Sequence, residues 1–271
     1  MRHPDPHFGY PTVSWRTNEL RSAPPSAARH RFLRQGALVL DTHIDAIDLD
    51  SAAQRILTWS SRQQSRIVTL CRVDTLVQAS RDPSLHRAIA QADLALPGDS
   101  GVAWAMRREG QRKQQALTAR ELMWRHLAQA EQAGQAVHFH GGTQASLERL
   151  LTSAQAAFPG LQVTGTPGAT HAPTPAEDLA LAHRITSTGA QVVFVGLEDA
   201  AQVHWMNAHR SQVRAVMIGL GPDFAQPPAL SEPTQPSPGL RARLATRVVF
   251  FARVLQNILL GAPPSRHEDP R

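Results

Sequence analysis

The sequence holds one cysteine, Cys71, among 271 residues. A single thiol cannot form a disulfide within the chain, and it cannot supply the sulfur ligands of a closed structural zinc site. Aromatic residues make up only 5% of the chain. No helix-turn-helix, zinc-finger or RNA-binding signature accompanies its basic charge, so the sequence argues against a protein that binds nucleic acid.

Long hydrophobic runs are also missing from the sequence. No stretch of 18 apolar residues occurs, and a helix that crosses a bilayer needs about that many. The first residues, MRHPDPHFGYPTVSW, lack the apolar core of a signal peptide. We therefore expect a cytoplasmic protein without a membrane-spanning helix.

Basic charge is supplied almost entirely by arginine, because Lys113 is the only lysine. The formal net charge is +6 and the isoelectric point is about 11. In one interpretation, arginine replaces lysine because the genome is rich in G and C. In the other, the arginines bind anions, because a guanidinium is well suited to phosphate and carboxylate and a basic surface attracts anionic lipid.

Four regions follow from shifts in composition along the chain. Residues 1–34 are rich in Pro, Ser, His and Arg and have no sustained period, which predicts a flexible extension. We expect an α/β domain over residues 35–221. A proline-rich linker is expected over residues 222–238, and a helix with a tail over residues 239–271. The composition of the whole, 42% hydrophobic and 18% charged, is that of a globular protein.

Short apolar strands alternate with helices of 10 to 15 residues at least four times between residues 65 and 220. This alternation is typical of a doubly wound, mostly parallel sheet with helices on both faces. A strand or hairpin is expected from Gly36, and a helix capped by Asp50 or Ser51 follows it. Two short helices are expected to break at Asp82 and Pro83.

An amphipathic helix is predicted as a C-terminal appendage. Its apolar residues at helical spacing are Leu240, Leu244, Val248, Phe251, Leu255 and Leu259, and its cationic residues are Arg241, Arg243, Arg247 and Arg253. One interpretation is a helix that packs permanently on the core. The other is an element that lies at a membrane surface or closes over an anionic ligand.

Candidate site residues follow the predicted strands, because ligands of open parallel sheets bind beyond the carboxyl ends of the strands. Asp99 lies in a glycine-containing turn at such an end, where it suits either a general base or the cap of the next helix. Gln202 and Trp205 share one face of a later helix. Neither G-x-G-x-x-G nor a Walker A sequence is present, so a dehydrogenase or a P-loop NTPase is not supported.

Two histidines, His138 and His140, alternate along one strand and therefore point to the same face. A metal pair would need a third ligand, and the sequence shows none. We expect neither a metal nor another cofactor.

Several longer segments follow one another along the chain: IDAIDLDSAAQRI, ASRDPSLHRAIAQADLALP, LTARELM, HFHGG, FPGLQVTGT and GAQVVFVGL. In this order and spacing they resemble the WecG/TagA/CpsF family of glycosyltransferases. The similarity runs from about Gly36 to Gly221, and more weakly to Leu260. The resemblance implies a doubly wound α/β domain with a mobile appendage. It implies transfer of a sugar, often N-acetylmannosamine, from a UDP-sugar to a saccharide on a polyprenyl diphosphate lipid. It also implies inversion of the anomeric centre and a reaction that needs no metal.

Several positions depart from the family pattern. Cys71 stands where the family has Asn in T-x-N, and Gly98 stands where P-D-G-x-G-V has its acid, so Asp99 is displaced by one residue. Ala119 replaces the glycine of T-G-x-D-L. Two interpretations remain: an active but divergent transferase in which Asp99 is the base, and a catalytically impaired member that acts as a binding or scaffold protein in the same pathway.

For the active interpretation, the residues receive roles from their places at the strand ends, from the resemblance and, for four arginines, from the charge of the C-terminal helix. The catalytic residues are Asp99 and Thr69; the substrate- or nucleotide-binding residues are Ser100, Gly101, Arg120, Glu121, Gly141, Gly142, Gly196 and Gln202; the residues that contact the membrane or the diphosphate are Arg241, Arg243, Arg247 and Arg253. The expected partners are the UDP-sugar, the lipid-linked acceptor and the anionic inner face of the cytoplasmic membrane. A homo-oligomer is compatible with the sequence.

Overall fold

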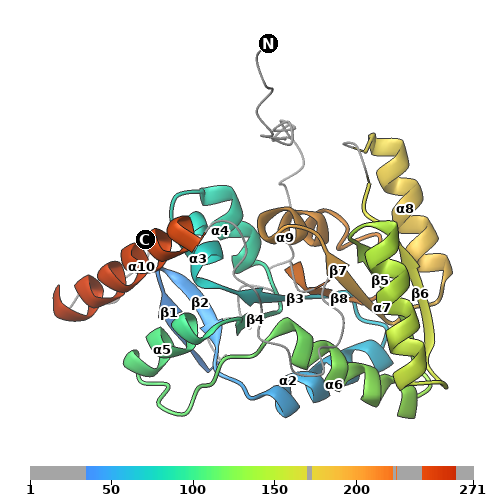
Figure 1. The fold of residues 1–271 in the computed structure, drawn as a ribbon, viewed down its shortest axis with the longest axis horizontal. Helices are drawn as coiled ribbons and strands as arrows, with labels where there is room; N and C mark the ends of the chain where they lie inside the picture. Colours follow the sequence, from blue (N-terminus) through green and yellow to red (C-terminus); the bar gives the residue numbers. More distant parts are fainter. Residues whose placement is uncertain (1–34, 170–172, 222–223, 225–239, 261–271) are drawn as a thin grey trace, which may run out of the picture.

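A six-stranded parallel sheet forms the centre of the protein (Figure 1). The computed structural model describes residues 35–169, 173–221, 224 and 240–260. The predicted extension at 1–34, nearly all of the predicted linker at 222–238 and the tail at 261–271 lie outside these described residues. The strands, in spatial order, are β4 (Leu94–Pro97), β3 (Arg66–Cys71), β8 (Val216–Gly219), β7 (Val192–Gly196), β5 (Ala136–Gly141) and β6 (Gln162–Thr166).

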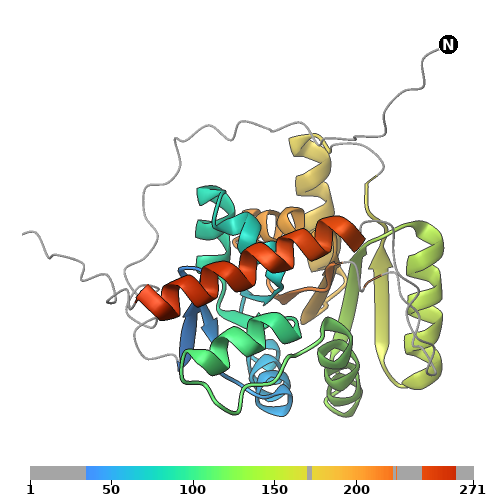
Figure 2. The same cartoon turned by 60° about the vertical axis from the view of Figure 1, so that its left-hand side comes forward.

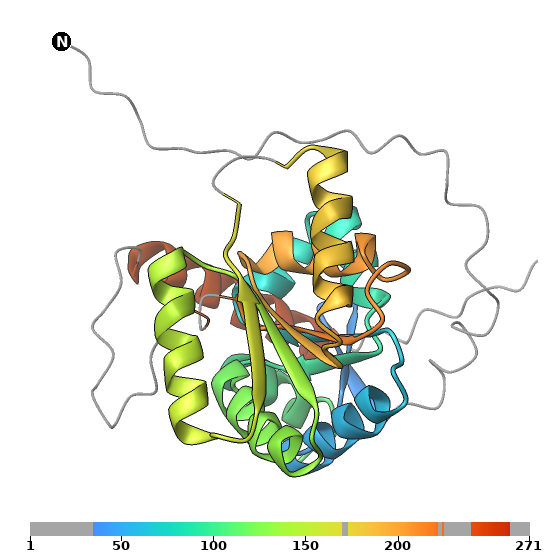
Figure 3. The same cartoon turned by 90° about the vertical axis from the view of Figure 1, so that its right-hand side faces the viewer.

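Helices cover both faces of this sheet, which confirms the predicted doubly wound architecture (Figure 3). Side chains of β3 show the alternation: Val68 and Leu70 join the core cluster on one face, whereas Ile67 and Cys71 join clusters on the other. The first face packs on α2 (Leu49–Ser61), α6 (Ala119–Gln132) and α7 (Gln144–Ala157). The second packs on α3 (Val73–Ala79), α4 (Pro83–Ala90), α8 (Pro175–Ser187) and α9 (Asp199–Ala208).

The predicted hairpin is present as β1 (Gly36–Val39) and β2 (Thr42–Asp45). It lies beside β4, the edge strand of the sheet, where Asp45 Oδ2 accepts a hydrogen bond of 2.7 Å from the Ala95 backbone N–H. The Ala95 N–H on this edge strand therefore bonds a buried carboxylate and is not available to pair with another strand.

Helix starts follow the expected capping chemistry, with one correction. The break at Asp82 and Pro83 is confirmed, because Asp82 caps α4. The predicted cap of α2 at Asp50 or Ser51 is wrong, since the helix begins earlier. Asp48 is the cap: its Oδ1 accepts from the Ser51 backbone N–H at 2.8 Å, and this bond lowers the pKa of Asp48.

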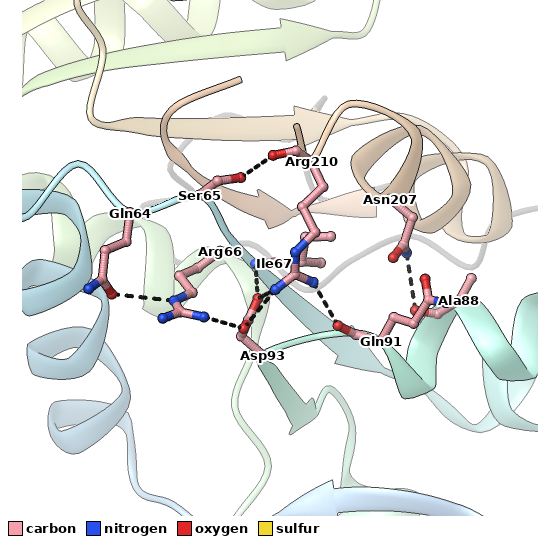
Figure 4. A network of polar contacts seen from close by, with 9 residues as sticks. All are labelled: Gln64, Ser65, Arg66, Ile67, Ala88, Gln91, Asp93, Asn207 and Arg210. Carbon is pink, nitrogen blue, oxygen red and sulfur yellow. Dashed lines mark hydrogen bonds and ion pairs between the residues drawn. The ribbon is translucent and has the colours of Figure 1, made fainter. Parts of the chain in front are cut away.

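An ion-pair network fixes the amino ends of β3 and β4 (Figure 4). The Asp93 carboxylate accepts from Arg66 Nη1 at 2.9 Å, from Arg210 Nη2 at 2.7 Å and from the Ile67 backbone N–H at 2.9 Å. Arg210 also donates to the Gln91 carbonyl oxygen at 2.9 Å. Two of the arginines are therefore structural, at the end of the sheet opposite the predicted site.

The C-terminal helix α10 (Leu240–Leu260) packs across α3 and α5 (Ser100–Arg108) in Figure 2. Phe250 and Val254 are buried there, and the Phe251 ring meets Trp104 edge-on at 4.9 Å. The predicted apolar stripe is wrong in part, because Val248 and Leu255 are 68% and 45% exposed. The helix turns its Phe250 side to the core, since that side offers two aromatic rings and a valine. Among the described helices, none is both long and apolar enough to span a membrane.

Candidate functional site

The carboxyl ends of the strands bring most of the predicted site residues to one edge of the sheet. In spatial order this edge carries Asp99 after β4, Thr69 and Cys71 in β3, Gly219 at the end of β8, Gly196 in β7 and Gly141 in β5. Gln202, from α9, lies over Gly219. Residues that are more than 100 positions apart in the sequence therefore meet here, as the sequence predicted for this crossover topology.

Asp99 joins the starts of two helices. Its Oδ1 accepts from the Val102 backbone N–H of α5, and its Oδ2 accepts from the Val73 backbone N–H of α3, both at 2.9 Å. The sequence alone suggested a cap of α5 and gave no sign of the second bond, because Val73 is 26 residues away. Asp99 thus holds α3 and α5 together at the point where their chains leave β3 and β4.

Small residues let the two helix starts approach each other. A Cβ added to Gly101 would lie 2.6 Å from Val73 Cγ2, so a side chain there would push α5 away from α3. A Cβ at Gly98 would lie 3.1 Å from the Cys71 carbonyl oxygen. Position 98 is where the resemblance places an acid, and here it faces the backbone of β3. Asp99 is therefore the carboxylate that this turn presents.

Thr69 lies in the interior, on the sheet face that α3, α4 and α9 cover. It is 1% exposed, and its Oγ1 has no hydrogen-bond partner among the described residues. The pairing of Val68 with Ile218 places Thr69 beside Gly219, where the Gln202 side chain fills the space that a Cβ would take. Gln202 Oε1 accepts from the Gly221 backbone N–H at 2.8 Å. Thr69 and Gln202 are neighbours, but both are buried.

The glycine turns after β5 and β7 bond to each other and pack under an aromatic ring. Gly142 N–H donates to the Gly196 carbonyl oxygen at 3.2 Å. A Cβ on Gly196 would collide with the Phe224 ring, which is buried against both turns. The Phe224 ring meets the Phe139 ring edge to face, with the ring centroids 6.4 Å apart. Sequence reasoning did not identify Phe224, which lies in the segment predicted as a proline-rich linker. No local pattern marks this residue, because its contacts with Gly142 and Gly196 arise only from packing.

The start of α6 lies beside the turn that holds Asp99, because the Leu117 N–H donates to the Pro97 carbonyl oxygen at 2.8 Å. Thr118 and Glu121 form a capping box there, with Glu121 Oε2 accepting from the Thr118 backbone N–H at 3.1 Å. Glu121 is exposed and Arg120 is half-buried. Both predicted binding residues are therefore near the edge, and the carboxylate of Glu121 caps its own helix.

Buried histidines occupy both faces of the sheet. His138 and His140 share one face, as predicted, and burial lowers the pKa of each to about 4, with nearby positive groups adding to the effect. His126 packs against Phe194 on the other face, and burial lowers its pKa to about 4 as well. In residues 35–169, 173–221, 224 and 240–260, no group of three or more His, Cys, Asp or Glu side chains could hold a metal ion.

Helix α10 covers the Asp99 end of the edge. The Phe251 ring would lie 3.9 Å from a Cβ on Gly101, two residues from Asp99. Arg253 Nη1 donates to Ser80 Oγ at 2.8 Å, and the Arg247 side chain is exposed. Arg241 and Arg243 belong to α10, but their side chains lie outside the described residues. One surface hollow, of about 710 Å³, lies between α2 and α6 on another side of the molecule.

Comparison with known proteins identifies a family over most of the chain. Residues 37–226 match the model of the glycosyl transferase WecG/TagA/CpsF family. The match includes every strand of the six-stranded sheet and ends before α10. Among curated proteins, no sequence matches the chain.

Proposed function

Because the chain belongs to the WecG/TagA/CpsF family of glycosyltransferases, we propose that it transfers a sugar from a UDP-sugar to a lipid-linked saccharide. The family points to the synthesis of surface polysaccharides. The finer proposal is that the sugar is N-acetylmannosamine or a related hexose, that the acceptor is carried on polyprenyl diphosphate, and that the anomeric centre is inverted. The observation that supports a transferase site is that Asp99, Thr69 and Gln202 lie with the glycine turns at one edge of the sheet.

Asp99 is the proposed general base. Each of its oxygens accepts one backbone N–H, which leaves a second lone pair on each oxygen for a substrate. In an inverting transfer, the acceptor hydroxyl oxygen attacks the anomeric carbon while its proton passes to Asp99. The bond from that carbon to the diphosphate oxygen breaks, and UDP leaves with the electron pair. Two fixed N–H donors hold the carboxylate in one orientation for this step.

The departing diphosphate needs positive groups at the same edge. Arg120 at the start of α6 can offer a charge-assisted hydrogen bond, and the first N–H groups of α7 follow Gly141 and Gly142. In the structure, α10 lies over the Asp99 end of this edge. We propose that α10 leaves the core at the inner face of the cytoplasmic membrane, so that the acceptor reaches Asp99, or that its arginines close over the diphosphate.

A second candidate function has specific observations in its favour. Both oxygens of Asp99 hold helix starts, the buried Thr69 Oγ1 has no hydrogen-bond partner within the part of the chain that the structure describes, and Phe224 fills the space above Gly196. A protein that uses its former site residues for structure would keep the fold and lose turnover. Such a protein would act as a binding or scaffold partner in polysaccharide synthesis.

Titration of UDP by calorimetry tests the donor site. We expect saturable binding by the parent protein. Arg120→Gln should weaken it by about tenfold, because hydrogen bonds to charged groups contribute about 1.5–3 kcal/mol. Arg149→Gln serves as the matched control, since Arg149 is exposed on α7 and bonds only within its own helix in the described structure. Equal affinities of both variants would remove Arg120 from the donor site.

Membrane association of α10 gives a separate prediction. Replacing Arg241, Arg243, Arg247 and Arg253 by Gln should reduce co-sedimentation with anionic vesicles by at least tenfold, because each basic residue near such a surface contributes about 1 kcal/mol. Binding by the parent should also weaken as salt rises. The control with the same charge change replaces four exposed arginines, Arg62, Arg81, Arg149 and Arg214. If the parent does not bind vesicles, or if both variants lose vesicle binding equally, α10 only packs on the core.

A further inference from the structure

Three aromatic rings stack between β5 and α9, and the proposed chemistry does not use them. The Trp205 ring lies between the rings of His140 and His209, with centroids 4.8 Å and 4.2 Å away. The interplanar angles are 37° and 24°. We call His140, Trp205 and His209 the histidine–tryptophan stack. It joins β5 to α9 on the face that α8 covers.

His209 anchors the stack to α8. Its Nδ1 lies 2.8 Å from the Trp205 carbonyl oxygen, and its Nε2 lies 3.1 Å from Asp178 Oδ2. Both partners are oxygen acceptors, so each ring nitrogen of His209 faces an oxygen atom. The ring is buried and stacks on the face of the Trp205 ring. Asp178, in the first turn of α8, thus fixes the outer end of the stack.

His140 forms the inner end and is uncharged at neutral pH. Burial lowers its pKa to about 4, and the neighbouring His209 and Arg184 side chains act in the same direction, whereas the bond to Thr166 opposes the shift. Its Nδ1 lies 3.3 Å from the Thr166 carbonyl oxygen, so that nitrogen carries the proton. His138, the next residue on the same strand face, is also neutral and bonds Thr164 Oγ1 at 2.8 Å. Trp205 therefore lies between two buried histidine rings, of which His140 is bonded to β6 and His209 to α8.

The stack touches two parts of the proposed donor site. His140 directly precedes Gly141 and Gly142, and Trp205 follows Gln202 by one turn of α9. We propose that Trp205 is a positioning residue, which holds α9 against β5 so that Gln202 and the Gly141–Gly142 turn keep one relative position. A UDP diphosphate at this edge would need both in place. This inference rests on the proposed function for its ligand, but not for the contact itself.

Amide hydrogen exchange tests the positioning directly. Trp205→Leu should speed exchange at Gly141, Gly142 and Gly221 by at least tenfold under conditions where the variant is folded. Asp178→Asn, which removes the charge that anchors His209 and leaves no cavity, should speed it several-fold. Trp124→Leu is the matched control: Trp124 is also half-buried but packs on Phe158 across the other sheet face. Unchanged exchange in the Trp205 and Asp178 variants, or equal acceleration in the control, would overturn the proposal.

UDP affinity then tests the link to the donor site. Trp205→Leu should raise the Kd for UDP by about tenfold, and Trp205→Phe, which keeps a stacking ring, should stay within about threefold of the parent. An unchanged Kd together with faster exchange would refute the claim that the stack positions the donor site. If the parent itself does not bind UDP, the proposed function fails, while the exchange measurements still decide whether the stack holds the turn.

Discussion

Asp99→Asn is expected to lower turnover by about 10²–10⁴-fold and the free energy of unfolding by about 1–2 kcal/mol. The loss of turnover follows from removing the proton acceptor. The loss of stability follows from the two backbone N–H groups that the carboxylate holds, Val73 and Val102. An amide has one oxygen, so its NH₂ group must face one of these donors and leave that donor unpaired.

The two effects of this substitution can be separated with a second cap. Asp82 caps α4 by accepting from the Ser84 and Leu85 N–H groups, and neither of these partners is a predicted site residue. Asp82→Asn should cost about 1 kcal/mol or less and leave turnover unchanged. Urea unfolding and steady-state kinetics of both variants measure the two quantities. Turnover of Asp99→Asn within about threefold of the parent would show that another group is the base.

Acid is expected to unfold the protein between about pH 5 and pH 4. The pKa values of His126, His138 and His140 are about 4 in the folded protein, compared with about 6.5 in an unfolded chain. From pH 6.5 down to pH 4 the unfolded chain therefore binds protons that the folded protein does not, so the free energy of unfolding falls as the pH falls. Each pKa unit corresponds to about 1.4 kcal/mol, so three histidines together approach the 5–15 kcal/mol typical of a whole domain.

His126→Leu isolates one of these contributions. Neither ring nitrogen of His126 has a hydrogen-bond partner among the described residues, and the side chain is fully buried. The substitution should therefore raise the free energy of unfolding at pH 7 by about 1–2 kcal/mol, because an unsatisfied buried polar group is removed. It should also reduce the fall in stability between pH 7 and pH 5. Urea unfolding at both pH values checks this, and an unchanged pH dependence would contradict it.

The sheet and its helix layers were predictable because apolar periodicity reports which elements are buried. The same patterns placed Asp99, Gly141 and Gly196 at strand ends, and the topology confirmed that these ends share one edge. Local spacing gave Asp99 as a cap of α5, since Val102 is three residues away. The second bond, to Val73, depends on how α3 and α5 pack, and no local pattern encodes that packing.

Features that depend on tertiary packing could not be predicted from the sequence. Val248 and Phe250 are both apolar and only two residues apart, so the pattern of α10 alone did not decide which one faces the core. The contact of Phe224 with Gly196 joins two segments that are 28 residues apart through a ring that no motif identified. The stacking of Trp205 between two histidines likewise requires β5, α8 and α9 to be in place.

Release of UDP from UDP-sugars by the parent protein, with and without a lipid-linked saccharide acceptor, tests the central claim most directly. The account predicts that at least one UDP-hexose is consumed, that the acceptor raises the rate, and that Asp99→Asn loses this activity while Asp82→Asn keeps it. If the protein binds UDP but releases none from any donor in the presence of acceptor, the proposed transferase activity is contradicted. The protein would then be a binding protein with a glycosyltransferase fold.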